Sequence, residues 1–254
     1  MADLILIETQ ADIHRIYLQA GKNNAISKKL VQELQTSFDI LLNDNSCRAV
    51  ILTSKHDKFF SPGLDLFEIS QFSREQMKSF MAGFGSLLQQ IYNFPKPVIA
   101  AINGHAVAGG FCLALACDLR IMQAANHIVG LNELRFGVVL PFGVVQLLRD
   151  AGGSTAARQM AYFGSNLTPQ EALQKGFIDR VVPVGSLHDT AFGLASELGS
   201  KIPAAFATIK RFLKHAPSKR ILEYEEKELE SFLDIWFSEE TQQRIKQAVM
   251  QLGQ

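Results

Sequence analysis

The most informative hydrophobic pattern lies in the middle of the chain, between Pro97 and Asp118. Residues 98–102, Val-Ile-Ala-Ala-Ile, form a short apolar run rich in β-branched side chains, which predicts a buried strand. Asn103-Gly104 interrupts this run, and residues 109–117 are small or apolar without a polar face. Because a helix that is apolar all round is buried, we expect a central strand, a tight turn and a buried helix here.

Strands and helices alternate through the first half of the chain. Apolar and polar positions predict strands at residues 4–9, 13–19, 48–53, 119–123 and 127–131. Amphipathic periodicity predicts helices at residues 28–43, with Ser27 as N-cap, and at residues 74–93, ending before Pro95. This alternation predicts crossover βαβ units and a largely parallel sheet.

The second half of the chain is mostly helical. Short helices are expected at residues 143–150, 155–162 and 169–175, and a short strand at residues 177–183. Four more helices follow at residues 187–201, 203–215, 221–237 and 239–252. We therefore divide the chain into a core, residues 1–186, and a C-terminal helical region, residues 187–254. An apolar stripe in this region is expected to pack on a neighbouring molecule, with packing inside one chain as the alternative: Ile221, Leu222, Leu229, Phe232, Leu233, Trp236 and Phe237.

Composition narrows the possible functions. The 254 residues include 25 Lys and Arg and 25 Asp and Glu, and this zero net charge favours neither nucleic-acid nor membrane-surface binding. No apolar run is long enough for a membrane span, and the N-terminus lacks the basic region of a secretory signal. Three cysteines without metal-ligand spacing indicate free thiols in a reducing compartment, so we expect a cytoplasmic protein without a metal site.

Candidate chemistry lies at the start of the central helix, at Gly109-Gly110. The first N–H groups of a helix have no internal partner, and with the positive end of the helix dipole they suit an anion or a developing oxyanion. The alternative is that both glycines only allow tight packing of helix against strand. Phe111-Cys112 follows where a P-loop has Lys-Ser/Thr, and the spacing of Gly104 and Gly109 excludes the dinucleotide fingerprint.

Five stretches, taken together and in this order, resemble the enoyl-CoA hydratase/isomerase (crotonase) superfamily. They are residues 24–27 (Asn-Ala-Ile-Ser), 60–66 (Phe-Ser-Pro-Gly-Leu-Asp-Leu), 101–118, 130–142 and 167–183. The resemblance implies a crotonase-like α/β fold of repeated ββα units with a C-terminal helical trimerisation region. It also implies acyl-CoA thioesters as substrates, no separate cofactor, and assembly as a homotrimer or as a hexamer of paired trimers.

The same resemblance implies two backbone donors for the thioester oxygen, the N–H groups of Leu64 and Gly109. In hydratases of this family one glutamate lies three residues after the oxyanion glycine and a second about 20 residues further on. Here the first position is Cys112 and the second is Glu133. Water addition uses two carboxylates, whereas moving a double bond needs only one base, and the Δ3,Δ2-enoyl-CoA isomerases also lack the first glutamate. We therefore expect an isomerase with Glu133 as its single acid/base.

Apolar neighbours are expected to raise the pKa of Glu133 toward neutrality: Leu131, Leu134, Phe136, Leu140 and Phe142. A solvated Glu133 at a turn is the alternative. Cys112 is expected to be a buried filler rather than a nucleophile, Asp65 to fix its loop by hydrogen bonds, and His105 to pack in a turn.

By the resemblance, the CoA and acyl groups contact residues from several loops: Lys22, Ala25, Ile26, Ser61, Gly63, Asp65, Leu66, Gly110 and Phe142. Lys246 is a candidate contact from a neighbouring chain, and Lys22 is alternatively just a solvated surface lysine. Four further phenylalanines are candidates for the acyl tunnel: Phe67, Phe72, Phe80 and Phe84. Other functions stay open: an enoyl-CoA hydratase, another crotonase-type reaction such as decarboxylation, or a catalytically silent CoA-ester binder.

Overall fold

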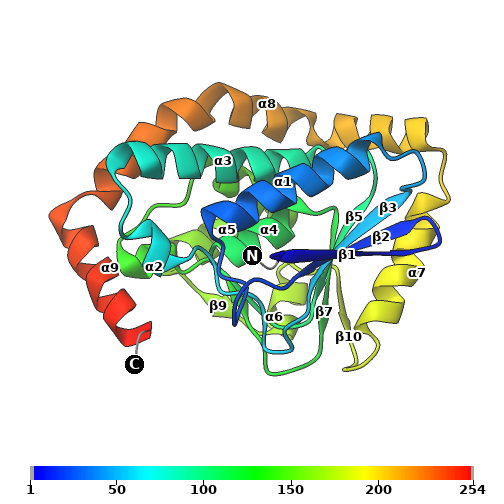
Figure 1. Ribbon diagram of the computed structural model, residues 1–254, viewed down its shortest axis with the longest axis horizontal. Coiled ribbons are helices and arrows are strands. Elements are labelled where there is room, and N and C mark those ends of the chain that lie inside the picture. The colour runs from blue at the N-terminus through cyan, green and yellow to red at the C-terminus, as the bar shows by residue number, and fades with distance from the viewer. Residues whose placement is uncertain (1–2, 253–254) are drawn as a thin grey trace.

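The computed structural model describes residues 3–252, arranged as two β-sheets surrounded by helices (Figure 1). The larger sheet has the strand order β1-β2-β3-β5-β7-β10, and the smaller sheet has the order β4-β6-β8-β9. The strands are β1 Ile5–Gln10, β2 Ile13–Leu18, β3 Ala49–Ser54, β4 Phe59–Ser61, β5 Val98–Ile102, β6 His105–Val107, β7 Leu119–Gln123, β8 Val129–Gly130, β9 Asn166–Leu167 and β10 Arg180–Val182.

The larger sheet is parallel apart from its first strand. β1 and β2 form an antiparallel hairpin, whereas β2, β3, β5, β7 and β10 pair in parallel. The expectation of a largely parallel sheet is therefore confirmed. The predicted core begins at residue 1 and the predicted C-terminal region ends at residue 254. Residues 1–2 and 253–254 lie outside the described residues.

Helices cover both faces of the larger sheet, with α7 on one face and α1, α3 and α4 on the other. The helices of the described chain are α1 Lys28–Asn43, α2 Leu66–Ile69, α3 Arg74–Tyr92, α4 Gly109–Ala116, the 3₁₀ turn η1 Glu133–Phe136, α5 Phe142–Phe163, α6 Pro169–Gln174, α7 Leu187–Gly199, α8 Pro203–Trp236 and α9 Glu239–Leu252. Ser27 caps α1 by accepting from Leu30 N–H, as the sequence predicts. None of these helices is both long and apolar enough to cross a membrane.

The alternation of side chains along β3 and β5 divides the core into two parts. Val50 and Leu52 of β3 join the large core under α1, α3 and α4, whereas Ala49 and Ile51 join a smaller core under α7. Successive residues of a strand point to opposite faces, so a strand buried on both faces is apolar throughout. This explains why residues 98–102 of β5 form an unbroken apolar run.

Two helices differ from the sequence-based expectation. α5 spans two expected helices, and its backbone breaks at Gly153, where φ is 72° and ψ is 171°. The expected break of the tail helix before residue 221 is wrong, because α8 continues through Pro217. An internal proline costs a helix about 3 kcal/mol, but contacts on both sides hold α8 in place. Lys214 contacts Asp118 before the proline, and Ser218 donates to Asn93 after it.

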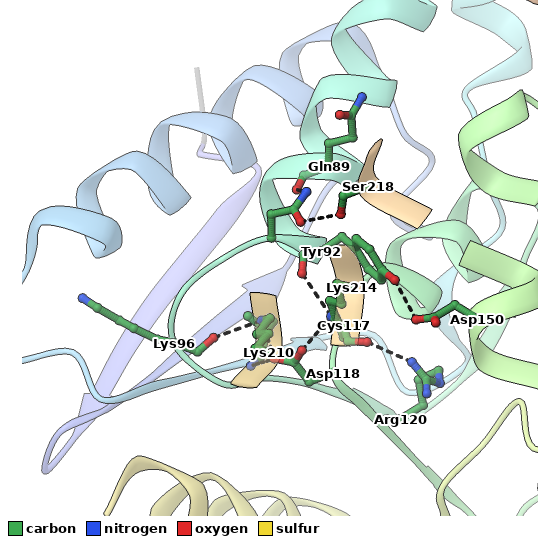
Figure 2. A network of polar contacts seen from close by, with 12 residues as sticks. Gln89, Tyr92, Lys96, Cys117, Asp118, Arg120, Asp150, Lys210, Lys214 and Ser218 are labelled. Atoms are coloured by element: carbon green, nitrogen blue, oxygen red, sulfur yellow. Dashed lines mark hydrogen bonds and ion pairs between the residues drawn. The ribbon is translucent and has the colours of Figure 1, made fainter. Parts of the chain in front are cut away.

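A buried polar network joins α8 to the end of the central helix α4 (Figure 2). Asp118 follows the C-cap residue of α4, and its carboxylate accepts from Lys210 at 2.6 Å, from Lys214 at 2.7 Å and from the N–H of Val98 at 2.8 Å. All three side chains are at least seven-eighths buried. The network of contacts around Asp118 is structural, because it links α8, α4 and β5.

The apolar stripe of the C-terminal region packs mainly within its own chain, which corrects the expectation of a neighbouring molecule. Ile221, Phe232, Leu233 and Trp236 are all buried in the large core. Leu222 alone of the seven is strongly exposed. The reason is that α8 runs along α3 and α5, so the stripe meets an apolar surface already provided by the same chain (Figure 1).

Candidate functional site

A cavity of about 230 Å³ lies where α3, η1, α8 and α9 meet the start of α4, and we call it the first cavity. Leu64, Gly109, Cys112 and Glu133 all line it, and the rest of its wall is mostly apolar. Glu133 carries the only carboxylate among the described lining residues. The structure thus brings the three predicted catalytic residues together around one space.

The backbone N–H of Leu64 points away from Ile26, the residue with which Leu64 is paired. Leu64 forms a parallel bridge with Ile26, in which Ile26 N–H donates to Gly63 O and Asp65 N–H donates to Ile26 O. Donors alternate along an extended chain, so the N–H of Leu64 points to the other side. Within residues 3–252 no acceptor binds this N–H.

The N–H of Gly109 is presented by a strained residue. Ala108 precedes α4 with φ at 48° and ψ at −130°, a conformation that non-glycine residues rarely adopt. Its own N–H donates to Gly130 O, which fixes the turn. As the first residue of α4, Gly109 has no acceptor inside the helix, and the described chain supplies none elsewhere.

Close packing between two loops explains the glycines of this region. A Cβ on Gly110 would lie 2.2 Å from Ser61 O, and one on Gly63 would lie 2.9 Å from the Cβ of Ala108. Gly63 also has a φ of 108°, which side chains disfavour. The packing explanation for Gly110 therefore holds, and it is compatible with a donor at Gly109.

Glu133 begins η1 and has its carboxylate in an apolar environment. Its Oε2 is buried and has no hydrogen-bond partner within the described chain. Burial raises the pKa of Glu133 from 4.5 to about 7, against a smaller lowering by a backbone hydrogen bond. The expected pKa shift is thus present, and the alternative of a solvated carboxylate is wrong. A carboxyl group poised near neutrality suits proton transfer in both directions.

The expected neighbours of Glu133 are only partly correct. Phe136 lines the first cavity, but Leu134 is half exposed, and Leu140 and Phe142 line a different cavity. Leu134 and Phe136 belong to η1, whereas Leu140 and Phe142 lie beyond it, next to and at the start of α5.

Ser61, Gly63 and Asp65 of the predicted substrate site use their polar groups in hydrogen bonds to other groups of the chain. The Asp65 carboxylate caps α2 by accepting from Phe67 N–H and Glu68 N–H, as expected for a residue that fixes its loop. The Ser61 hydroxyl is buried, donates to Asn24 O and accepts from Gly63 N–H. These bonds hold the segment that presents Leu64.

The other predicted contacts differ in burial, and only some of them line the first cavity. Lys22 is exposed, Ala25 is half-buried, Ile26 is buried, and Leu66 lines the first cavity. Lys246 is exposed on α9. Of the four tunnel phenylalanines only Phe84 lines the first cavity, whereas Phe67 is exposed and Phe80 packs edge-on against Phe72.

Cys112 lines the first cavity as a buried thiol. Burial raises its pKa well above the usual value, and the negative charge of Glu133 raises it further. A thiol that stays protonated is a poor nucleophile, which fits the expectation of a small buried filler.

Sequence reasoning missed the part of the wall that comes from the tail. Phe232 and Trp236 of α8 and Ile245 of α9 line the first cavity, and Phe232 and Trp236 stack at 6.0 Å between ring centroids. The apolar stripe that contains Phe232 and Trp236 was visible in the sequence, but the sequence did not show which surface this stripe contacts. Thr241 of α9 fixes that helix over the site by donating to Gly137 O.

Comparisons with known proteins agree with this architecture. The family model of enoyl-CoA hydratase/isomerase matches residues 8–250. The chain is 30% identical over 224 residues to human mitochondrial enoyl-CoA delta isomerase 1, covering 88% of this chain and 74% of that protein. It is 35% identical over 214 residues to carnitinyl-CoA dehydratase of Shigella flexneri, covering 84% and 81%.

The fold comparison gives the same result. The crystal structure of human mitochondrial delta3-delta2-enoyl-CoA isomerase superposes with a TM-score of 0.95 at 28% identity, covering 99% of this chain and 98% of that one. The chain therefore belongs to the enoyl-CoA hydratase/isomerase family and is an acyl-CoA enzyme of the crotonase superfamily.

Proposed function

We propose that this protein is a Δ3,Δ2-enoyl-CoA isomerase with Glu133 as its single acid/base. The observation that carries the proposal is the single carboxylate of the first cavity, set among apolar side chains beside Leu64 and Gly109. The human isomerases among the relatives and solved structures support it.

In the proposed reaction the substrate is a 3-enoyl-CoA. The amides of Leu64 and Gly109 bind the thioester oxygen, and the Glu133 carboxylate takes a proton from C2. The electrons of that C–H bond move into a dienolate, whose negative charge develops on the oxygen held by the two amides. Glu133 then returns the proton to C4, which gives the 2-enoyl-CoA. Each oxyanion donor is typically worth about 3 kcal/mol of the barrier.

The predicted substrate contacts remain part of this proposal. Leu66 and Gly63 border the acyl thioester, and Lys22, Ala25 and Ile26 border the nucleotide and pantetheine part of CoA. Ser61, Asp65 and Gly110 act through the shape of the loop, because their polar groups or Cα atoms pack inside it.

Replacing Glu133 with Gln tests the proposal. Gln keeps the shape of the side chain but cannot accept the C2 proton, so conversion of 3-hexenoyl-CoA to 2-hexenoyl-CoA should fall about 10²–10⁴-fold in kcat. Binding of saturated hexanoyl-CoA should persist. Glu240→Gln, at an exposed position of α9, is the control and should keep full turnover. Undiminished turnover by Glu133→Gln would remove Glu133 from the mechanism.

A second candidate, CoA-ester hydration or dehydration, is favoured by the 35% identity to carnitinyl-CoA dehydratase. This reaction requires Glu133 to activate a water molecule alone, because residue 112 is a cysteine and supplies no second carboxylate. Supplying 2-hexenoyl-CoA and measuring 3-hydroxyhexanoyl-CoA separates it from the isomerase. Binding of both esters without conversion of either would instead indicate a catalytically silent binder.

We also propose assembly as a homotrimer or as a hexamer of paired trimers. The exposed apolar side chains of α8 support self-association, among them Ile209, Phe212 and Leu213. Light scattering after size-exclusion chromatography measures the assembly directly. A cytoplasmic location stays a prediction, and the relatives named above include a mitochondrial and a bacterial protein.

A further inference from the structure

A second cavity lies directly behind the first and shares part of its wall. It also measures about 230 Å³ and lies between the start of α5 and the C-terminal part of α8. Four residues line both cavities: Met81 of α3, Val139 and Pro141 of the segment before α5, and Phe232 of α8. The two spaces are therefore separated by a wall only one side chain thick.

The wall contains side chains that can move. Met81 is unbranched and has three rotatable bonds, so it adapts to irregular spaces at low cost. Phe232 belongs to α8 and stacks on Trp236, which lines only the first cavity of the two. Rotation of Met81 changes the shape of this shared wall without movement of the backbone.

The second cavity offers an apolar surface beyond this wall. Leu140, Phe142 and Val145 line one side, and Leu229 and Ile235 line the other, with Glu228 and Ser231 as further polar lining residues. The Glu225 carboxylate at its edge is engaged elsewhere, because it accepts from Gly143 N–H at the start of α5. Glycines at positions 85 and 143 leave room for that carboxylate. An occupant of this cavity therefore meets mainly hydrocarbon.

The size of the first cavity limits the acyl chain that it holds. A group the size of a water molecule occupies about 30 Å³, so a cavity of about 230 Å³ holds roughly eight such groups. The six carbons of a hexanoyl chain lie within this number, whereas the fourteen carbons of a tetradecanoyl chain exceed it. A longer chain that starts at Glu133 must leave the first cavity, and the wall at Met81 and Phe232 leads into an apolar space.

We propose that the second cavity binds the distal part of long acyl chains, and that Met81 and Phe232 form the gate between the two cavities. This inference rests on the proposed function, because it takes the acyl group of a CoA thioester as the occupant of the first cavity. Phe142, predicted to contact substrate, takes its place in the distal part of the site. Each methylene buried is worth about a fourfold gain in affinity.

Filling the second cavity from either side tests the proposal. Leu229→Trp on α8 and Val145→Phe on α5 enlarge side chains that line the second cavity but not the first. Leu222→Trp is the matched control, because it lies on the same helix, is strongly exposed and lines neither cavity. Calorimetry measures the Kd of saturated hexanoyl-CoA and tetradecanoyl-CoA for each protein, and turnover of 3-hexenoyl-CoA and 3-tetradecenoyl-CoA is measured alongside.

Both filling variants should weaken tetradecanoyl-CoA binding at least tenfold and change hexanoyl-CoA binding less than twofold. The retained hexanoyl-CoA binding shows that each variant is folded. Equal losses for both esters, or no loss for either, would overturn the gate and its second cavity. If the unmodified protein binds both esters but converts neither enoyl-CoA, the isomerase proposal fails while the chain-length result still decides this inference.

Discussion

A Cβ on Gly63 would lie 3.2 Å from the amide nitrogen of Gly109, so the loop before α2 and the start of α4 touch at this point. The residue after Gly63 carries one proposed oxyanion donor, and Gly109 carries the other. Contact between the two loops, rather than any side chain, therefore sets the separation of the two amides. Ala108 contributes its strained backbone to the same arrangement.

Gly63→Ala should lower kcat strongly and lower the free energy of unfolding only slightly. The new methyl group meets the Cβ of Ala108 at 2.9 Å and sits on a backbone with φ at 108°, so the loop must move. Displacement of one oxyanion donor typically costs about 10²–10³ in kcat. Steady-state kinetics with 3-hexenoyl-CoA measures the effect. Gly83→Ala, where a Cβ meets nothing within 4 Å, should leave kcat unchanged, and equal kcat values for the two variants would contradict this account.

The pH dependence of activity should follow ionisation of Glu133. Only the carboxylate accepts the C2 proton, and burial raises the pKa of Glu133 to about 7. The value of kcat/KM for 3-hexenoyl-CoA should increase about tenfold per pH unit up to pH 6 and should be constant above pH 8. The buried Cys112 thiol has a pKa well above its usual value and adds no further step at neutral pH. A flat profile between pH 5 and pH 9 would show that another group, or none, limits the rate.

Glu133→Gln should stabilise the protein above neutral pH. Because burial raises the pKa from 4.5 to about 7, the folded state holds its proton while the unfolded chain ionises, and stability falls as pH rises between these values. Gln does not titrate, so it avoids this loss. At pH 8 the free energy of unfolding of the variant should exceed that of the unmodified protein by about 3 kcal/mol. The difference should fall below about 1 kcal/mol at pH 5.

Urea denaturation of both proteins at the two pH values measures this difference. All other titrating groups are shared by the two proteins, so they cancel in the comparison. A variant less stable than the unmodified protein at pH 8 would mean that the carboxylate is stabilised by a partner.

Asp118→Ala should destabilise the attachment of α8. The change leaves Lys210 and Lys214 buried without their carboxylate (Figure 2). Removing one partner of a buried ion pair typically costs about 3–5 kcal/mol, and thermal denaturation should show a clear loss. Glu230→Ala is the matched control, since Glu230 also contacts two cations, Arg74 and Lys78, but at the surface. Its loss should stay below about 1 kcal/mol, and similar losses in both variants would argue against the anchoring role.

The sequence by itself determined most of the local structure and the type of chemistry. The apolar run at residues 98–102 predicted β5, and the residues after Gly109 predicted the buried helix α4. Period-2 and period-3.6 patterns reflect which faces are buried, so they are readable without a structure. The family resemblance, which the sequence also carries, showed Cys112 where hydratases have their first glutamate and Glu133 at the position of the second.

Only the tertiary structure decided what closes the site. Leu134, Leu140 and Phe142 were expected around Glu133, but Leu134 is half exposed, and Leu140 and Phe142 line the second cavity. Phe232 and Trp236, about 100 residues later in the chain, form the wall instead. The spacing of apolar residues along a helix shows that the helix has an apolar stripe, but it does not show which distant surface the stripe contacts. In this protein that surface is set by the way α8 packs against α3 and α5.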